Sequence, residues 1–168
     1  MNYFIQSLTY FRIFIAPLIF LLITFYDSYV WALFLFILAS ISDYWEIDRF
    51  CKEIGIEWFF SAWDINSQIE MRIFNSKYNK VASAMATNHE FLKLVASERK
   101  HTFMSTGMMN MDEIKNALDI FIHENCPVTL LHTVSTYPAE ESTLNLKCIN
   151  TLKDKFNVPV GYLNFPLS

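Results

Sequence analysis

Glycine, proline and cysteine are scarce in this sequence, with 3, 5 and 3 residues respectively among 168. So few glycines and prolines disfavour a flexible linker between domains. Cys51, Cys126 and Cys148 are scattered and odd in number, which matches neither a disulfide framework nor a zinc site, so we expect reduced, buried thiols. No basic cluster is present and the net charge is -4. The composition therefore predicts no nucleic-acid partner.

Charge is also nearly missing from the first 42 residues, where only Arg12 and Asp27 carry it. Two apolar runs, residues 1–26 and 28–42, flank Asp27 and predict a transmembrane α-helical hairpin, although each apolar core is slightly short of the ~20 residues that span a bilayer. The alternative is a cleaved signal peptide, which predicts a basic start and a single apolar run. Because the positive residues lie outside the turn, both ends should be cytoplasmic. We therefore expect membrane contact through residues 1–42, in a bacterial-type inner membrane, with residues 43–168 in the cytoplasm.

From residue 47 onward the apolar residues follow the periods of alternating strands and helices. The pattern predicts about five parallel strands, with helices between them capped at Asn88 and Asn110. In the helix after Asn110, Ile114, Leu118 and Ile122 should face the core. The expected strands are residues 57–61, 78–83, 101–106, 127–135 and 158–162. This α/β pattern leaves two folds open, a doubly wound sheet and a partial (β/α)8 TIM barrel.

Polar residues recur just past the carboxyl end of each expected strand. In a barrel these ends form one mouth, where such side chains converge. A lysine with hydroxyl and backbone N–H groups suits a phosphate or a carboxylate. Each residue taken alone is an ordinary turn or cap residue, but their recurrence favours a barrel with an anion site. The residues are Ser61 and Asp64, Lys80 and Ser83, Ser105 and Thr106, and Ser135 and Tyr137.

The segments "LTYFRIFIAPLIFLL" and "LFILASISDYWE" resemble the start of the CDP-alcohol phosphotransferases, especially the phosphatidylglycerophosphate synthases. That family holds divalent metals with several carboxylates, which neutralise a pyrophosphate and activate an alcohol. Asp43 matches the first of these carboxylates and Glu46 stands at the second position, but the rest of the motif is absent. The resemblance covers about residues 1–46. It implies a metal role for Asp43 only if the motif were complete.

A second resemblance covers about residues 47–162. The motifs "KVAS", "STGM", "LLHTVSTYP" and "PVGY", in this order and spacing, are similar to those of the N-acetylneuraminate (sialic acid) synthase family. The resemblance implies a TIM barrel that condenses phosphoenolpyruvate with N-acetylmannosamine or a related amino sugar and releases phosphate. It also implies a divalent metal, typically manganese, and a homodimer.

The same resemblance implies substrate-binding residues but no assigned catalytic residue. Tyr137 matches a tyrosine beside the sugar, and Ser135 stands where some members have Asn. Met85 stands where some members have Glu. The residues matched to phosphoenolpyruvate are Lys80, Ser83 and Ser105, with Ser61 near the same ligand.

The histidines are not expected to bind a metal. We expect His132 to be a satisfied core residue, and His89, His101 and His123 to lie at the surface. The family's metal-binding histidine after "PVGY" and its first two βα units are not found in this sequence. No metal ligand is therefore expected in residues 47–168.

These features predict a fusion of a membrane hairpin (residues 1–46) with a truncated synthase-like barrel segment (residues 47–168). The main hypothesis is a sialic acid synthase-like domain that is inactive as this chain. The alternatives are a phosphotransferase-like membrane fragment of phospholipid synthesis, and a fusion product without enzymatic activity.

Overall fold

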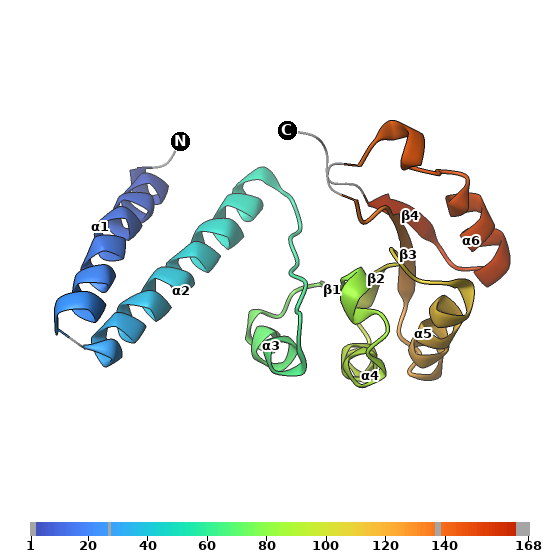
Figure 1. Ribbon diagram of the computed structural model, residues 1–168, viewed down its shortest axis with the longest axis horizontal. Coiled ribbons are helices and arrows are strands. Elements are labelled where there is room, and N and C mark those ends of the chain that lie inside the picture. The colour runs from blue at the N-terminus through green and yellow to red at the C-terminus, as the bar shows by residue number, and fades with distance from the viewer. Residues whose placement is uncertain (1–2, 27, 137–138, 164–168) are drawn as a thin grey trace. The chain divides into compact units, whose positions relative to one another are not determined.

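The computed structural model describes residues 3–26, 28–136 and 139–163. The chain divides into two compact units, Met1–Glu57 and Trp58–Ser168. The first unit consists of helices α1 (Tyr3–Tyr26) and α2 (Tyr29–Ile54), which pack side by side (Figure 1). Gly55 caps the C-terminus of α2, and its φ of 71° is the left-handed conformation that glycine adopts without strain. The predicted division between residues 46 and 47 stays a prediction.

The two apolar helices are present, but they are not membrane spans. Within the described residues, no helix combines the length and the apolar character needed to cross a bilayer. The uncharged runs fall short of the ~20 residues that a span needs, and α2 continues into a charged half in which Lys52 pairs with Asp48 at 2.7 Å and Arg49 with Glu53 at 3.1 Å. The predicted transmembrane hairpin and inner-membrane location are therefore wrong, and the predicted membrane partner is not supported.

The second unit is a four-stranded parallel sheet covered by helices. Its strands alternate with helices along the chain, as the periodicity predicts. The elements are α3 (Ile65–Glu70), η1 (Met71–Phe74), β1 (Tyr78–Val81), η2 (Ser83–Met85), α4 (His89–Ser97), β2 (His101–Ser105), α5 (Met111–His123), β3 (Val128–Thr133), η3 (Glu141–Thr143), α6 (Cys148–Phe156) and β4 (Val160–Leu163).

The strand order favours one of the two folds that the sequence leaves open. The strands lie in the order β1-β2-β3-β4, and every neighbouring pair is parallel. A doubly wound sheet reverses its order at a switch point, whereas consecutive βα units of a barrel pair in sequence. The prediction of an α/β fold is confirmed, and the sheet is consistent with part of a TIM barrel.

One expected strand is missing from the sheet. Residues 58–62 form no helix and no ladder, although Phe59 contacts residues of β1 and β2. Phe59 stacks on Phe103 with ring centroids 5.4 Å apart and meets Tyr78 edge-on at 6.1 Å. Side chains rather than backbone bonds therefore place this segment, and the sheet has four strands rather than five.

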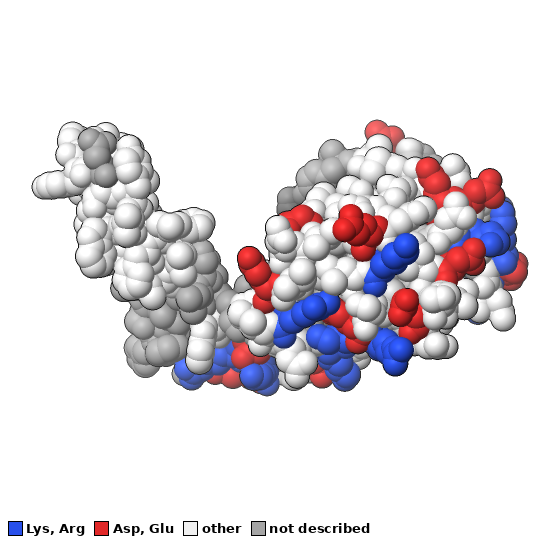
Figure 2. All heavy atoms as spheres, turned by 90° about the horizontal axis from the view of Figure 1, so that it is seen from below, with Lys and Arg blue, Asp and Glu red and all other residues white. Residues whose placement is uncertain are grey.

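The core lies between the sheet and its helices (Figure 1). Phe91, Leu92 and Val95 of α4 are fully buried. Asn88 caps this helix as predicted, since its Oδ1 accepts a hydrogen bond from Phe91 N at 3.1 Å. Asn110 caps α5 with a complete capping box. On the face of the second unit shown in Figure 2, acidic and basic side chains are interspersed.

The expected apolar face of α5 needs one correction. Ile114 and Leu118 are each 3% exposed, but Ile122 is 62% exposed and Phe121 is buried in its place. At 3.6 residues per turn a residue at i+8 has rotated well past the stripe, whereas one at i+7 stays on it.

Candidate functional site

A cavity of about 250 Å3 opens at the carboxyl ends of the strands. It collects the ends of β1, β2 and β3, together with the segment before α3. Five of the six residues predicted to bind substrate line it. The lining residues are Ser61, Trp63, Lys80, Ala82, Ser83, Ala84, Ser105, Met108, Thr133, Ser135 and Leu163.

Lys80 supplies the positive charge of the cavity. It is the third residue of β1, and its neighbours Asn79 and Val81 are buried toward the helices. Alternation along the strand therefore turns Lys80 to the cavity side. No carboxylate pairs with Lys80 among the described residues, and partial burial lowers the pKa of its ammonium group below the ordinary value. Ser61 Oγ donates a hydrogen bond to the Lys80 carbonyl oxygen at 3.3 Å, which ties the segment before α3 to this strand.

Ser105 ends β2 with a hydroxyl that has no partner. The residue is 2% exposed, and its Oγ makes no hydrogen bond within the structure. Leaving a buried polar group unpaired costs about 1–3 kcal/mol. Because the residue also lines the cavity, this hydroxyl is available to a ligand there.

Ser83 and Gly107 join the loops that follow β1 and β2. Gly107 N donates a hydrogen bond to Ser83 Oγ at 3.1 Å. A Cβ added at Gly107 would collide with Ser135 Oγ and lie 2.9 Å from Ser83 Oγ. Three loops therefore meet around a position where only hydrogen fits, and this brings the hydroxyls of Ser83 and Ser135 to the same side of the cavity.

The remaining polar residues at the strand ends have structural roles in the described chain. Asp64 is the N-cap of α3, where Oδ1 accepts a hydrogen bond from Ser67 N at 2.9 Å. Hydrogen bonds from the Ser67 side chain and backbone lower the pKa of the Asp64 carboxyl. Thr106 Oγ1 donates to the Leu131 carbonyl at 3.2 Å. Tyr137 lies outside the described residues.

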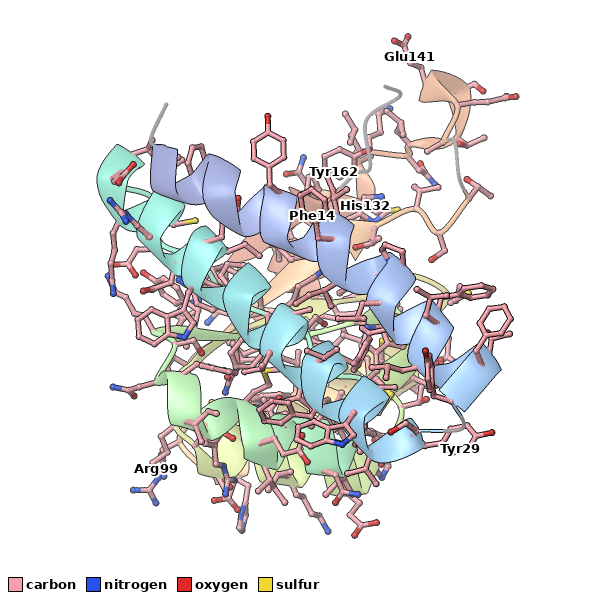
Figure 3. All side chains as sticks on the ribbon, turned by 90° about the vertical axis from the view of Figure 1, so that its left-hand side faces the viewer. Phe14, Tyr29, Arg99, His132, Glu141 and Tyr162 are labelled. Carbon is pink, nitrogen blue, oxygen red and sulfur yellow. The ribbon has the colours of Figure 1, made fainter. Side chains whose placement is uncertain are left out.

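The histidines and Met85 line no part of this cavity. His132 Nε2 lies 2.8 Å from the Leu144 carbonyl oxygen, and its ring lies beside that of Tyr162 (Figure 3). This agrees with the expected satisfied histidine, although the residue is half-buried. His101 is not the surface residue that the sequence predicts, because it is half-buried with Nε2 2.9 Å from Thr129 Oγ1. Met85 packs against the core.

Trp63, Met108 and Thr133 are cavity residues that the sequence did not single out. Trp63 and Met108 are 63% and 79% exposed, so they form an apolar rim beside the polar floor. The position of Trp63 between Ser61 and the helix cap Asp64 could have indicated a cavity residue, because a large aromatic side chain in a turn has no core to pack against. Met108 has a φ of 64°, which the sequence does not indicate.

The described lining does not fit a divalent metal. It offers hydroxyls, one ammonium group and apolar side chains, without a carboxylate, imidazole or thiolate. Nor does any cluster of three or more potential metal ligands occur in the part of the chain that the structure describes. Divalent metals such as manganese take carboxylate, carbonyl and imidazole ligands, so the side chains of this lining do not match the ion that the resemblance implies.

Comparisons with known proteins agree on one family. The NeuB family model matches residues 27–164. The N,N'-diacetyllegionaminic acid synthase of Campylobacter jejuni is 33% identical over 120 residues, which cover 70% of this chain and 36% of that protein. The pseudaminic acid synthase of the same species is 42% identical over 83 residues, covering 49% of this chain and 24% of that protein.

Structural similarity points the same way. The N-acetylneuraminic acid (sialic acid) synthetase of Leptospira borgpetersenii superposes with a TM-score of 0.64 at 28% identity, covering 77% of this chain and 43% of that one. The chain thus spans well under two thirds of the length of these proteins. None of these matches supports the phosphotransferase resemblance or the fusion inferred from it. The family match begins at residue 27 and runs through the expected junction, where α2 is continuous. The chain belongs to the NeuB family.

Proposed function

We propose that the cavity binds the phosphate or carboxylate group of phosphoenolpyruvate, as part of a synthase that condenses this substrate with N-acetylmannosamine or a related amino sugar. The observation that carries the proposal is the pairing of Lys80, a half-buried cation without a described counter-ion, with the unpartnered buried hydroxyl of Ser105. Both lie at one cavity. An anion there would satisfy both groups at once.

The chemistry of the lining supports an oxyanion ligand. An ammonium group and hydroxyl donors make charge-assisted hydrogen bonds to phosphate and carboxylate oxygens. Ser83 already accepts a hydrogen bond from Gly107 N, so its own hydroxyl proton remains available for donation. Loss of water from a half-buried site strengthens each of these contacts.

The size of the cavity favours the smaller substrate. Its volume of about 250 Å3 lies below the ~300–1,000 Å3 of sites that enclose drug-sized ligands. A three-carbon phosphate matches this space better than an amino sugar does. We place the sugar near Ser135 and the rim, and the resemblance implies that Tyr137 also contacts the sugar.

In the reaction itself, C3 of phosphoenolpyruvate forms a bond to the aldehyde carbon of the open-chain sugar, and the aldehyde oxygen takes up a proton. A water molecule adds at C2, and the bond from C2 to the phosphate oxygen breaks, so that inorganic phosphate is released. The role proposed for the cavity residues is to hold the phosphoenolpyruvate. Lys80 would balance its negative charge, while Ser83 and Ser105 would fix its orientation, which is how positioning lowers a barrier. The manganese ion and the homodimer implied by the resemblance stay predictions.

Ligand titration of the full chain, followed by amide NMR, tests the proposal. Phosphoenolpyruvate and inorganic phosphate should each shift the amide signals of Lys80, Ser83 and Ser105. Acetate is a carboxylate without phosphate, so its effect on the same signals distinguishes carboxylate binding from phosphate binding. Lys80→Met should weaken binding by roughly 10- to 100-fold, since a hydrogen bond to a charged group contributes about 1.5–3 kcal/mol.

The matched control is Lys93→Met, which removes an exposed lysine of α4 that does not line the cavity. Shifts that persist unchanged in Lys80→Met, or that disappear equally in Lys93→Met, would show nonspecific anion binding and refute the assignment of this cavity.

A further inference from the structure

A second polar group of residues lies outside the cavity, between α3, β1 and the C-terminal end of α4. We name it the Glu98 cluster, after the carboxylate at its centre. Glu98 Oε1 accepts hydrogen bonds from Gln68 Nε2 at 3.1 Å and from Arg72 Nε at 3.0 Å. Glu98 Oε2 accepts one from Asn79 Nδ2 at 2.9 Å. The members are Gln68, Arg72, Asn79 and Glu98.

The cluster is buried, with one charged member reaching the surface. Gln68 and Asn79 are each 2% exposed, and the Glu98 side chain is 7% exposed against 44% for Arg72. Removing one partner from such a network leaves a buried charge or amide unpaired, which costs more than the bond itself gained. Gln68 Nε2 also lies 3.5 Å from Asn79 Oδ1, a longer contact than any of the three to Glu98, so the geometry of the group depends chiefly on Glu98.

Helix α3 has little else to hold it. Gln68 is its one buried side chain, and η1, which follows it, has none. Ile69 and Ile73 are 45% and 78% exposed, and Ile65 alone packs partly against the core. An apolar face normally attaches a helix to its domain, but here a buried amide bonded to Glu98 takes that role.

The segments that Glu98 joins both lead directly into the cavity. Helix α3 begins right after Ser61 and Trp63, which line it. Asn79 precedes Lys80 on β1. A displacement of α3 would move Ser61 and Trp63 away from Lys80, to whose carbonyl Ser61 is bonded.

We propose that Glu98 is a positioning residue for the cavity: it holds α3 against β1, and so fixes Ser61 and Trp63 beside Lys80. The functional part of this inference rests on the anion site proposed above. The structural part can be tested without any ligand.

Hydrogen exchange on the full chain tests the structural part. In Glu98→Ala, exchange of amides in residues 65–76 should accelerate by roughly 10- to 100-fold, since bonds to a charged group are lost. Amides of β2 and β3 should change far less. Glu98→Gln keeps one acceptor oxygen and should restore much of the protection. Glu90→Ala, which removes an exposed carboxylate from the same helix, should leave these amides unchanged.

Two results would overturn the proposal. Equal acceleration in α3 and in β2 and β3 would mean that Glu98 stabilises the whole unit without a specific hold on α3. No acceleration in α3 would mean that the cluster does not hold it. Should Glu98→Ala fail to fold, Arg72→Met provides the same comparison with a weaker expected effect, because Arg72 is partly exposed.

A phosphate titration then links the cluster to the cavity. Glu98→Ala should weaken phosphate binding and reduce the shifts at Ser61, while Glu98→Gln restores both. If the unchanged chain binds no phosphate, the proposed anion site fails, but the exchange result still decides the role of Glu98. If phosphate binds equally well to Glu98→Ala, the positioning role is wrong.

Discussion

Gly107→Ala is the substitution that most directly probes the packing of the three loops at the cavity. The added methyl group would collide with Ser135 Oγ and would lie 2.9 Å from Ser83 Oγ and 3.2 Å from the Thr133 carbonyl oxygen. The Ser135 side chain is exposed and can rotate away. Ser83 is held by its bond to Gly107 N, and the Thr133 oxygen belongs to the backbone, so these two contacts must be relieved by movement of the loops.

The expected cost follows from these contacts. Overpacking a buried site costs about 1–3 kcal/mol, and we expect the lower end of this range because two of the three close atoms are side-chain hydroxyls. The same movement shifts Ser83, so phosphate affinity should fall by roughly 2- to 10-fold, which corresponds to one neutral hydrogen bond of about 0.5–1.5 kcal/mol.

Urea unfolding, followed through NMR signals of β2 and β3, measures the free energy of unfolding of the second unit, and phosphate titration measures the binding. Ser135→Ala alone should change stability by less than about 0.5 kcal/mol, as expected for an exposed side chain. Combined with Gly107→Ala it should recover part of the loss, because it removes the oxygen in the worst collision. If Gly107→Ala has wild-type stability and phosphate affinity, the reasoning about this junction is wrong.

Further predictions concern charge, thiol reactivity, packing and turnover. Burial lowers the pKa of Lys80, so between its folded and ordinary pKa values the folded state binds fewer protons than the unfolded state. The free energy of unfolding should therefore rise with pH through that window, whereas phosphate affinity should fall as Lys80 loses its charge. Urea unfolding and phosphate titration at a series of pH values measure the two trends. Burial raises the pKa of the Cys126 thiol, so iodoacetamide should modify it far more slowly than an unfolded cysteine, as mass spectrometry can follow. Ile114→Ala should cost about 2–5 kcal/mol of unfolding free energy and Ile122→Ala less than about 1 kcal/mol, measured by urea unfolding. The chain alone, given phosphoenolpyruvate, N-acetylmannosamine and manganese, should yield no sialic acid by mass spectrometry; turnover abolished by Lys80→Ala would contradict this.

The second unit could be predicted well from sequence because its signals are local. Strand and helix periods, and the caps at Asn88 and Asn110, depend on residues within a few positions of one another. The gathering of Ser61, Lys80 and Ser105 at one cavity could also be predicted, since the carboxyl ends of parallel strands meet at one edge.

Features that depend on distant partners could not be predicted in this way. Glu98 bonds to residues 30, 26 and 19 positions away, and no local pattern marks it as the centre of a cluster. Residues 57–61 have the composition of a strand, but a strand also needs a ladder partner, which periodicity cannot supply. The apolar start of the chain was also misread, because its two helices are long enough to span a bilayer but their uncharged stretches are not.

Strand β1 connects the buried cluster to the cavity through the simplest property of a strand, the alternation of its side chains. Asn79 is bonded to Glu98 on the helix-covered side, and Lys80 lines the cavity on the other. A slip of one residue in the pairing with β2, where Asn79 lies opposite Thr102 and Lys80 opposite Phe103, would turn every side chain to the wrong face. It would bury the Lys80 charge on the side of the apolar core and remove the Asn79 amide from Glu98, and each of these changes is strongly unfavourable. The residues that place the cation at the cavity are therefore also those that make the alternative register costly, so the Glu98 cluster helps to specify the fold as well as the site.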